Sequence, residues 1–324
     1  MDQLTVIQTR LSRELDEMNA IIRQSLFTDN ELMNTVVSNY LAIKGKQIRP
    51  IMVLLSAGLF GGINEDVLHA GAALEMLHNA SLIHDDVVDE TALRRGRPTT
   101  NAIWGNHIAV LVGDYFTSNA LSAGIRTGNI AIISALSDLG KELSLGEIDQ
   151  ICNARDHHLD EESYIGMIRK KTASLFRNCA KMGAETAGAT PEEYTPLVEY
   201  SEILGLCFQI KDDIFDYFDS KQIGKPTGND LREGKVTLPL LYALNTAPLE
   251  EAEPMKALLH KGNLTNEEIN TLIEFAKANG GIEYAYDRMR AMQQEADHLI
   301  ESYPDSRWKQ SLRDIFAYII DRDK

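Results

Sequence analysis

Apolar residues recur at helical spacing along most of the chain. The clearest such segments are 3–27, 30–44, 130–152, 161–187, 191–219, 235–245, 265–279 and 281 to the C-terminus. No stretch alternates β-branched and polar residues for long enough to predict a sheet, and no Pro- or Ser-rich linker divides the 324 residues. The pattern therefore predicts an all-α protein, a bundle of about ten or more helices in a single domain, 1–324.

Three aspartates stand at the end of one predicted helix, in the sequence HDDVVDE. Asp85 and Asp89 are one turn apart on the same face, and Asp86 is next to them. Like charges at this spacing destabilise an isolated helix. They become favourable when a divalent cation lies between the carboxylates, and hard oxygen ligands suit Mg²⁺. A lone cluster of this kind is more often a solvated helix end, so it needs a second observation.

The same acidic pattern occurs again much later in the chain, in the sequence KDDIFD. Asp212 and Asp216 share a helix face, and Asp213 is beside Asp212. Two acidic faces turned toward each other would repel strongly when empty, whereas Mg²⁺ with a diphosphate would hold them together. Two motifs are much more specific than one, and they predict a diphosphate site that contains Mg²⁺.

The overall charge narrows the function classes. The formal net charge is −16, which argues against binding to nucleic acid or to an anionic membrane surface. No apolar run approaches 18 residues, so we expect no transmembrane segment, and the acidic N-terminus is not typical of a signal peptide. The three cysteines have no metal-ligand spacing. Together these features favour a cytoplasmic protein.

Basic residues are scarce, but they gather in four short breaks or helix ends beside glycine, serine or threonine. The groups are Lys44, Lys46 and Arg49; Arg94, Arg95 and Arg97; Lys170 and Lys171; and Lys221, Lys225, Arg232 and Lys235. Backbone N–H groups at such places also bind phosphate. One group alone would indicate a solvated surface, whereas four groups in an acidic protein with two aspartate motifs favour diphosphate binding.

With these motifs in this order, the sequence resembles the trans-polyprenyl diphosphate synthases of the isoprenyl diphosphate synthase family. The resemblance spans nearly the whole chain, through GKQIRP, LHNASLIHDDVVDETALRRGRPT, GDY, GEIDQ, MIRKKTASLF, FQIKDDIFD and GKPTGNDLREGKVTLP. It implies the isoprenoid synthase fold, in which helices surround a central cavity. It also implies a homodimer and an enzyme of the long-chain type.

The resemblance implies a role for each matching residue. The expected Mg²⁺ ligands, for three ions with bound diphosphate, are Asp85, Asp86, Asp89, Asp212, Asp213 and Asp216. The cations expected at the allylic diphosphate are Arg94, Lys171, Lys225 and Lys235, and those at the metal-free isopentenyl diphosphate site are Lys46, Arg49, His78 and Arg95. Thr172 and Gln209 match residues whose dipoles flank the carbocation. The expected catalytic set comprises these two residues, the first aspartate motif, Lys171 and Asp212.

The expected reaction joins isopentenyl diphosphate head-to-tail to farnesyl or geranylgeranyl diphosphate and gives an all-trans polyprenyl diphosphate. The growing hydrocarbon should run along the helix of the first motif, where one turn rises about 5.4 Å, comparable to one isoprene unit. Ala80 and Ser81 are small where short-chain relatives usually place aromatic residues, and Leu77 would line the deeper tunnel. We therefore expect a product longer than C20, with C40 as the prediction within a range of C30 to C50, for a quinone side chain.

Other functions of related proteins can be compared with the motifs present in this sequence. A class I terpene cyclase usually carries a different second metal motif and lacks the GKxxRP element, and a regulatory subunit typically loses aspartates from one motif. Both are disfavoured because both complete motifs are present. A geranylgeranyl diphosphate synthase and the catalytic subunit of a heterodimeric medium-chain synthase stay open as alternatives.

Overall fold

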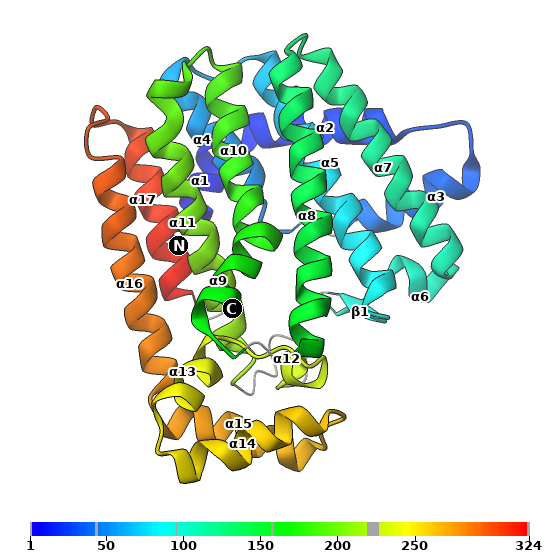
Figure 1. Ribbon diagram of the computed structural model, residues 1–324. Coiled ribbons are helices and arrows are strands. Elements are labelled where there is room, and N and C mark those ends of the chain that lie inside the picture. The colour runs from blue at the N-terminus through cyan, green and yellow to red at the C-terminus, as the bar shows by residue number, and fades with distance from the viewer. Residues whose placement is uncertain (1, 43–44, 95, 157–158, 219–226, 323–324) are drawn as a thin grey trace. The chain divides into compact units, whose positions relative to one another are not determined.

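The computed structural model describes residues 2–42, 45–94, 96–156, 159–218 and 227–322. Nearly all regular structure in these residues is helical (Figure 1). The helices are α1 (Gln3–Arg10), α2 (Ser12–Leu26), α3 (Glu31–Leu41), α4 (Ile48–Phe60), α5 (Glu65–Val88), α6 (Thr100–Trp104), α7 (Asn106–Arg126), α8 (Ile130–Asp156), α9 (Glu161–Ile168), η1 (Arg169–Ala173), α10 (Ser174–Thr186), α11 (Pro191–Phe215), α12 (Asn229–Arg232), α13 (Leu238–Thr246), α14 (Leu249–Lys261), α15 (Asn266–Ala278), α16 (Gly281–Leu299) and α17 (Arg307–Asp321).

The described chain divides into two compact units. The first comprises Met1–Lys141, Leu175–Ser201 and Ile300–Ile315, and the second comprises Glu142–Ser174, Glu202–Leu299 and Phe316–Lys324. Helices α8, α10, α11 and α17 contribute residues to both units. The all-α prediction is confirmed, whereas the single-domain assignment stays a prediction.

The core of the first unit is built on α5. The Asn64 side chain accepts a hydrogen bond from the Val67 amide at 2.9 Å and so begins the helix. The middle of α5 is buried, and α7 lies alongside it (Figure 1). Gly71 permits a close approach to α2, because a Cβ atom there would lie 2.3 Å from Cε of Met18. The first aspartate motif therefore lies at the C-terminal end of a helix whose middle is packed in the core.

The second unit carries the second motif on α11, whose apolar side chains Leu204, Cys207 and Ile210 are fully or almost fully buried. Helices α13, α15 and α16 pack against one another in this unit. Gly281 begins α16 where a side chain would not fit, since a Cβ atom would lie 2.1 Å from the Pro239 carbonyl oxygen. The C-terminal half of α11 is therefore held in a packed helical layer.

Several predicted boundaries differ from the structure. The predicted helix 3–27 is two helices, α1 and α2, which meet at Leu11. Two short antiparallel strands of two residues each, β1 (Leu93–Arg94) and β2 (Arg97–Pro98), follow the first motif, although no strand was predicted. Their pairing joins Leu93 to Pro98 and Arg94 to Arg97, which fixes the position of Arg94.

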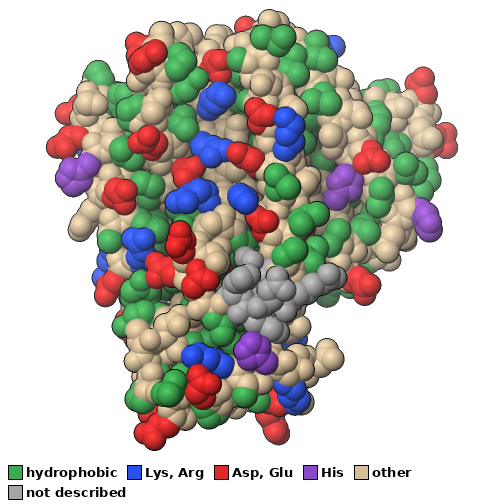
Figure 2. Space-filling model, viewed as in Figure 1, with side chains coloured by type: hydrophobic (Ala, Val, Ile, Leu, Met, Phe, Trp, Pro, Cys, Tyr) green, Lys and Arg blue, Asp and Glu red, His purple; other side chains and the backbone are tan. Residues whose placement is uncertain are grey.

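Two surface properties complete the description. Acidic and basic side chains are interspersed on the face displayed in Figure 2. By length and composition, one helix in the described residues, α7, would suffice to cross a membrane, and a core helix of a soluble protein meets the same test. Here α7 buries Val112, Phe116 and Ala120, which accounts for part of its apolar character.

Candidate active site

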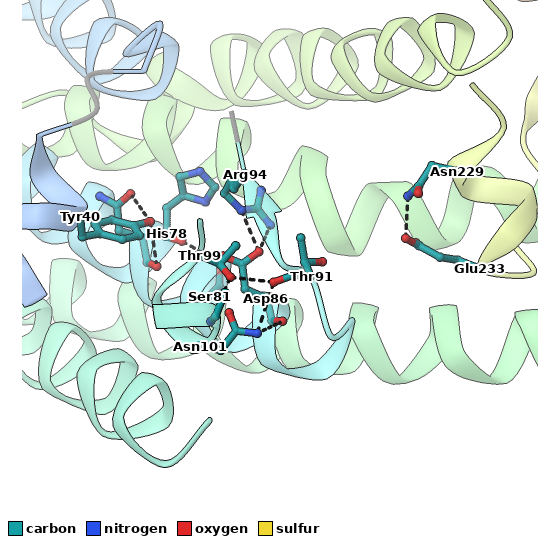
Figure 3. A network of polar contacts seen from close by, with 12 residues as sticks. Tyr40, His78, Ser81, Asp86, Thr91, Arg94, Thr99, Asn101, Asn229 and Glu233 are labelled. Carbon is teal, nitrogen blue, oxygen red and sulfur yellow. Dashed lines mark hydrogen bonds and ion pairs between the residues drawn. The ribbon is translucent and has the colours of Figure 1, made fainter. Parts of the chain in front are cut away.

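In the first motif, Asp86 points into a polar network rather than to solvent. Its side chain is 4% exposed, and one carboxylate oxygen, Oδ1, accepts hydrogen bonds from Nε and Nη2 of Arg94 at 2.9 and 2.8 Å (Figure 3). Asn101 donates to the backbone carbonyl of Asp86 at 3.1 Å. Arg94 thus contacts the first motif directly, and its expected binding to the allylic diphosphate stays a prediction.

The other first-motif aspartates are more accessible. Asp85 is partly exposed in the last turn of α5, and Asp89 is exposed at its C-cap. The two are separated by one helical turn, and the Asp89 amide donates to the Asp85 carbonyl at 2.8 Å. Two accessible carboxylates one turn apart match the mode in which one or two protein carboxylates hold Mg²⁺ together with substrate phosphates.

In the second motif each aspartate has a different set of partners. Asp213 is buried and accepts hydrogen bonds from the Tyr164 hydroxyl at 2.6 Å and the Gln209 amide at 2.7 Å. Asp216 accepts from the backbone amides of Asn229 and Asp230, both at 2.9 Å. It thereby ties α11 to the short helix α12.

Unlike Asp213, Asp212 is partly exposed. Its side chain is 41% exposed, and its Oδ1 atom lies 2.5 Å from Nη2 of Arg322. Among the residues that the structure describes, no hydrogen bond to the other oxygen, Oδ2, is present. Asp212 therefore has one oxygen held by the protein and one available for a ligand.

A chain of hydrogen bonds joins the predicted cation-flanking dipoles to the second motif. The Thr172 hydroxyl donates to Oε1 of Gln209 at 2.7 Å, and Gln209 in turn donates to Asp213. Burial, with the nearby charge of Asp230 adding to it, raises the pKa of Asp213 well above its ordinary value. Burial and the same Asp213 carboxylate raise the pKa of Tyr164, which stays a hydroxyl donor.

Lys171 and Thr172 project from η1, a single turn of π-helix between α9 and α10. Such turns occur as short bulges in helices, frequently at functional sites. Lys171 lies 2.5 Å from Oε2 of Glu147 and donates to Gln150 at 2.8 Å, both on α8. Gly146 permits this contact, because a Cβ atom there would lie 2.9 Å from the Lys171 backbone nitrogen. The GEIDQ sequence thus both packs against the π-helix and binds its lysine.

These groups converge on a cavity of about 150 Å³ in the second unit. Its lining includes Lys171, Thr172, Gln209, Asp213 and Lys235, all of which the sequence nominated. Tyr164 and Asp230 also line the cavity and were not predicted. Tyr164 carries no motif of its own, whereas Asp230, in the sequence GNDLREGK between two nominated lysines, was within reach of the pattern.

The remaining nominated residues belong to the first unit or fall outside the described residues. Lys46 is exposed before α4, Arg49 lies in the first turn of α4 with its guanidinium 5.3 Å from the Phe176 ring centroid, and His78 is buried on α5. Arg95 and Lys225 lie outside the described residues. The assignment of these five residues to diphosphate sites stays a prediction.

The three nominated tunnel residues all lie on α5. Ala80 is 1% exposed and Leu77 is 7% exposed, whereas Ser81 is partly exposed and donates to the His78 carbonyl at 2.9 Å. All three are small or aliphatic, so none of these three positions carries an aromatic side chain.

The donor set fits Mg²⁺ bound with a diphosphate better than Mg²⁺ bound alone. Within the described ranges, no three His, Cys, Asp or Glu side chains gather into a preformed metal site. Mg²⁺ keeps several water or phosphate ligands and is commonly held by one or two carboxylates plus substrate phosphates. Asp85 and Asp89 in the first unit, and Asp212 in the second, each supply carboxylate oxygens of this kind, which are the hard ligands that Mg²⁺ prefers.

Comparisons with known proteins bear on the whole chain. The family model Polyprenyl synthetase matches residues 30–276. The octaprenyl diphosphate synthase of Escherichia coli (strain K12) is 34% identical over 322 residues, which cover 99% of this chain and 99% of that protein.

Two solved structures are similar throughout. A polyprenyl synthase from Caulobacter crescentus CB15, complexed with calcium and isoprenyl diphosphate, has a TM-score of 0.93 at 29% identity, with 99% of this chain and 98% of that chain covered. A geranylgeranyl pyrophosphate synthase from Bacteroides thetaiotaomicron has a TM-score of 0.86 at 41% identity, with 99% and 100% covered.

Proposed function

We propose that this protein makes a long-chain all-trans polyprenyl diphosphate. The chain belongs to the polyprenyl synthetase family and is therefore a prenyltransferase. The substrates are isopentenyl diphosphate and an allylic diphosphate, either farnesyl or geranylgeranyl diphosphate. The observation that carries the proposal is the cavity lined by Lys171, Thr172, Gln209 and Lys235 beside the second aspartate motif. It combines cations for a diphosphate with neutral dipoles for a carbocation.

The proposed chemistry begins with departure of the allylic diphosphate. Mg²⁺, when bound, neutralises this leaving group and lowers the barrier to breaking its C–O bond. Lys171, Lys235, Lys225 and Arg94 bind diphosphate oxygens and carry part of the same charge. The Thr172 hydroxyl donates a hydrogen bond to Oε1 of Gln209, so its oxygen lone pairs can face the allylic cation.

The second substrate completes the reaction. Lys46, Arg49, His78 and Arg95 bind the diphosphate of isopentenyl diphosphate. The electron pair of its double bond attacks the allylic carbon and forms the new C–C bond. A proton then leaves the adjacent carbon for the released diphosphate, which restores a double bond and leaves a chain longer by one isoprene unit.

The small residues of α5 support a long product. With Ala80 and Ser81 as the floor and Leu77 beyond them, we propose that elongation passes C20 and ends at C40, within C30 to C50, for a quinone side chain. The E. coli relative that is named for an octaprenyl product supports this length. The 41% identity to a geranylgeranyl pyrophosphate synthase supports the alternative of a C20 product.

The proposal extends to assembly and location. We propose a cytoplasmic homodimer that binds three Mg²⁺ ions with diphosphate, with Asp85, Asp89 and Asp212 as direct ligands. The partners of Asp86, Asp213 and Asp216 support a role in fixing the shape of the site as well as in charge balance.

A prenyl-transfer assay with two aspartate variants tests the function. We expect the purified chain to elongate farnesyl diphosphate with isopentenyl diphosphate and Mg²⁺. Asp85→Ala and Asp212→Ala should each lower turnover by about 100-fold or more, because each removes charge stabilisation from the leaving group. Circular dichroism should show both variants folded. Wild-type turnover in either folded variant would contradict the metal assignment.

A further inference from the structure

Arg322 is the last described residue of the chain and is bound to the second aspartate motif. Its side chain is 5% exposed, and Nη2 lies 2.5 Å from Oδ1 of Asp212. The same nitrogen donates to the Phe208 carbonyl at 3.2 Å. The guanidinium lies 4.4 Å from the ring centroid of Phe208 and 5.3 Å from that of Phe215. Arg322, the residue after α17, is thus anchored on α11, the helix that carries the motif.

A buried guanidinium needs a carboxylate, and here Asp212 provides it. Removing a charged group from water costs free energy that pairing and hydrogen bonding must offset. The two phenylalanine rings provide favourable faces for the cation but no countercharge. The position of Arg322 therefore depends on Asp212, and in return the Asp212 carboxylate is restricted in rotation.

The contact uses only one of the two Asp212 oxygens. Oδ1 is held by Arg322, whereas the side chain is 41% exposed and Oδ2 accepts no hydrogen bond from the described residues. The neighbouring cation Lys211 does not compete for it, since Lys211 is buried and donates to the Tyr286 hydroxyl at 2.8 Å. Arg322 is thus the cation that orients this carboxylate.

We propose that Arg322 is a positioning residue for the second metal site. It holds Oδ1 of Asp212 so that Oδ2 is presented to a divalent cation, a role that rests on the proposed function. Groups that hydrogen-bond to metal ligands fix their orientation, and their loss typically lowers metal affinity by 10- to 100-fold. Tyr164 and the amides of α12 fix Asp213 and Asp216 in the same way, so all three carboxylates of the motif have a protein group that orients them.

Direct metal binding to the full chain tests the inference without an activity assay. Mn²⁺ replaces Mg²⁺ because free Mn²⁺ has an electron paramagnetic resonance signal and also prefers oxygen ligands. With inorganic pyrophosphate present, we expect Arg322→Met to weaken Mn²⁺ binding by at least about 10-fold. Arg322→Lys keeps a cation and should recover part of this loss.

Lys211→Met is the matched control. It also removes a buried cation beside Asp212, and it should lower the melting temperature while leaving Mn²⁺ affinity as in the wild type. Unchanged Mn²⁺ affinity in folded Arg322→Met would overturn the proposal, as would tighter binding, which would mean that Arg322 competes with the metal. Absence of pyrophosphate-dependent Mn²⁺ binding in the wild type would instead overturn the metal assignment of the proposed function, and this role of Arg322 with it.

Discussion

At the scale of single residues, Asp213 links the site to stability. Burial raises its pKa, so the folded protein binds this proton more tightly than the unfolded chain, whose aspartates titrate near pH 3.9. The contribution of Asp213 to the free energy of unfolding is therefore largest at acidic pH and is lost as pH rises through the folded-state pKa.

This pH dependence of the free energy of unfolding predicts the effect of Asp213→Asn, because asparagine cannot ionise. In metal-free protein at pH 8 the variant should melt at a higher temperature than the wild type, and the difference should shrink toward pH 4. Asp138→Asn is the control, because a hydrogen bond from Lys141 lowers the pKa of Asp138 and the variant should gain nothing at pH 8. A lower melting temperature for Asp213→Asn at pH 8 would contradict the argument.

Ala80→Phe tests the tunnel floor. If the space beyond Ala80 receives the growing chain, the ring should shorten the product, as measured by mass spectrometry, with a melting temperature close to that of the wild type. If Ala80 faces only packed core, the larger side chain should destabilise the protein by about 1–3 kcal/mol. A destabilised variant with an unchanged product would contradict the tunnel assignment.

Sequence spacing nominated candidate site residues but not their partners. Asp85 and Asp212 were predicted because each has a second aspartate one helical turn further along the same face. Tyr164 and Arg322, by contrast, contact the second motif from elements that are remote in sequence. Such contacts depend on packing between elements, which periodicity within one element does not encode. Arg322 in particular belongs to none of the motifs.

At the scale of elements, η1 depends on a small residue in α8. A methyl group at Gly146 would lie 2.9 Å from the backbone nitrogen and 3.0 Å from Cα of Lys171. We expect Gly146→Ala to displace the π-helix and lower turnover by about 100-fold, because shifts near 1 Å in a catalytic group have effects of this size.

Gly140→Ala in the same helix is the matched control for Gly146→Ala. A Cβ atom at Gly140 would meet no described atom within 4 Å, so this variant should keep its activity. It should also be more stable by about 1 kcal/mol from helix propensity. Equal turnover in the two variants would contradict a role for the close approach at Gly146.

Helical periodicity located most elements but not all their ends. The periodicity missed the break at Leu11, because the apolar pattern continues across it. It also did not predict α14, which contains Pro254. The hairpin after the first motif was also missed, since two-residue strands carry no alternation. The π-helix leaves no signal in spacing, because it adds one residue to a turn within a continuous helix.

At the scale of the whole molecule, the all-α isoprenoid synthase fold inferred from the sequence is confirmed by similar solved structures that cover nearly the whole chain. The motifs identified this fold because they span the chain in order. The proposed homodimer would use a face of α7, which exposes Leu111, Leu121 and Ile125 on the side opposite its buried residues. Exposed apolar side chains gathered on one helix face can pack against a second copy of the chain.

We therefore expect Leu111→Asp combined with Ile125→Asp to convert a dimer into monomers, as measured by light scattering with size-exclusion chromatography. Leu249→Asp is the control, since Leu249 is 72% exposed on α14 and lies outside this face. A monomeric wild type, or a dimer that survives both substitutions, would contradict the proposed homodimer surface.

We propose that this prenyltransferase elongates an allylic diphosphate beyond C20. The most direct measurement is mass spectrometry of the products formed by the purified chain from farnesyl diphosphate, isopentenyl diphosphate and Mg²⁺. We predict a ladder of intermediates that ends at one polyprenyl diphosphate, C40. A product that stops at C20 would contradict the proposed tunnel along α5. If the folded protein does not elongate the substrate at all, the proposal that this chain acts without a different partner subunit would be contradicted.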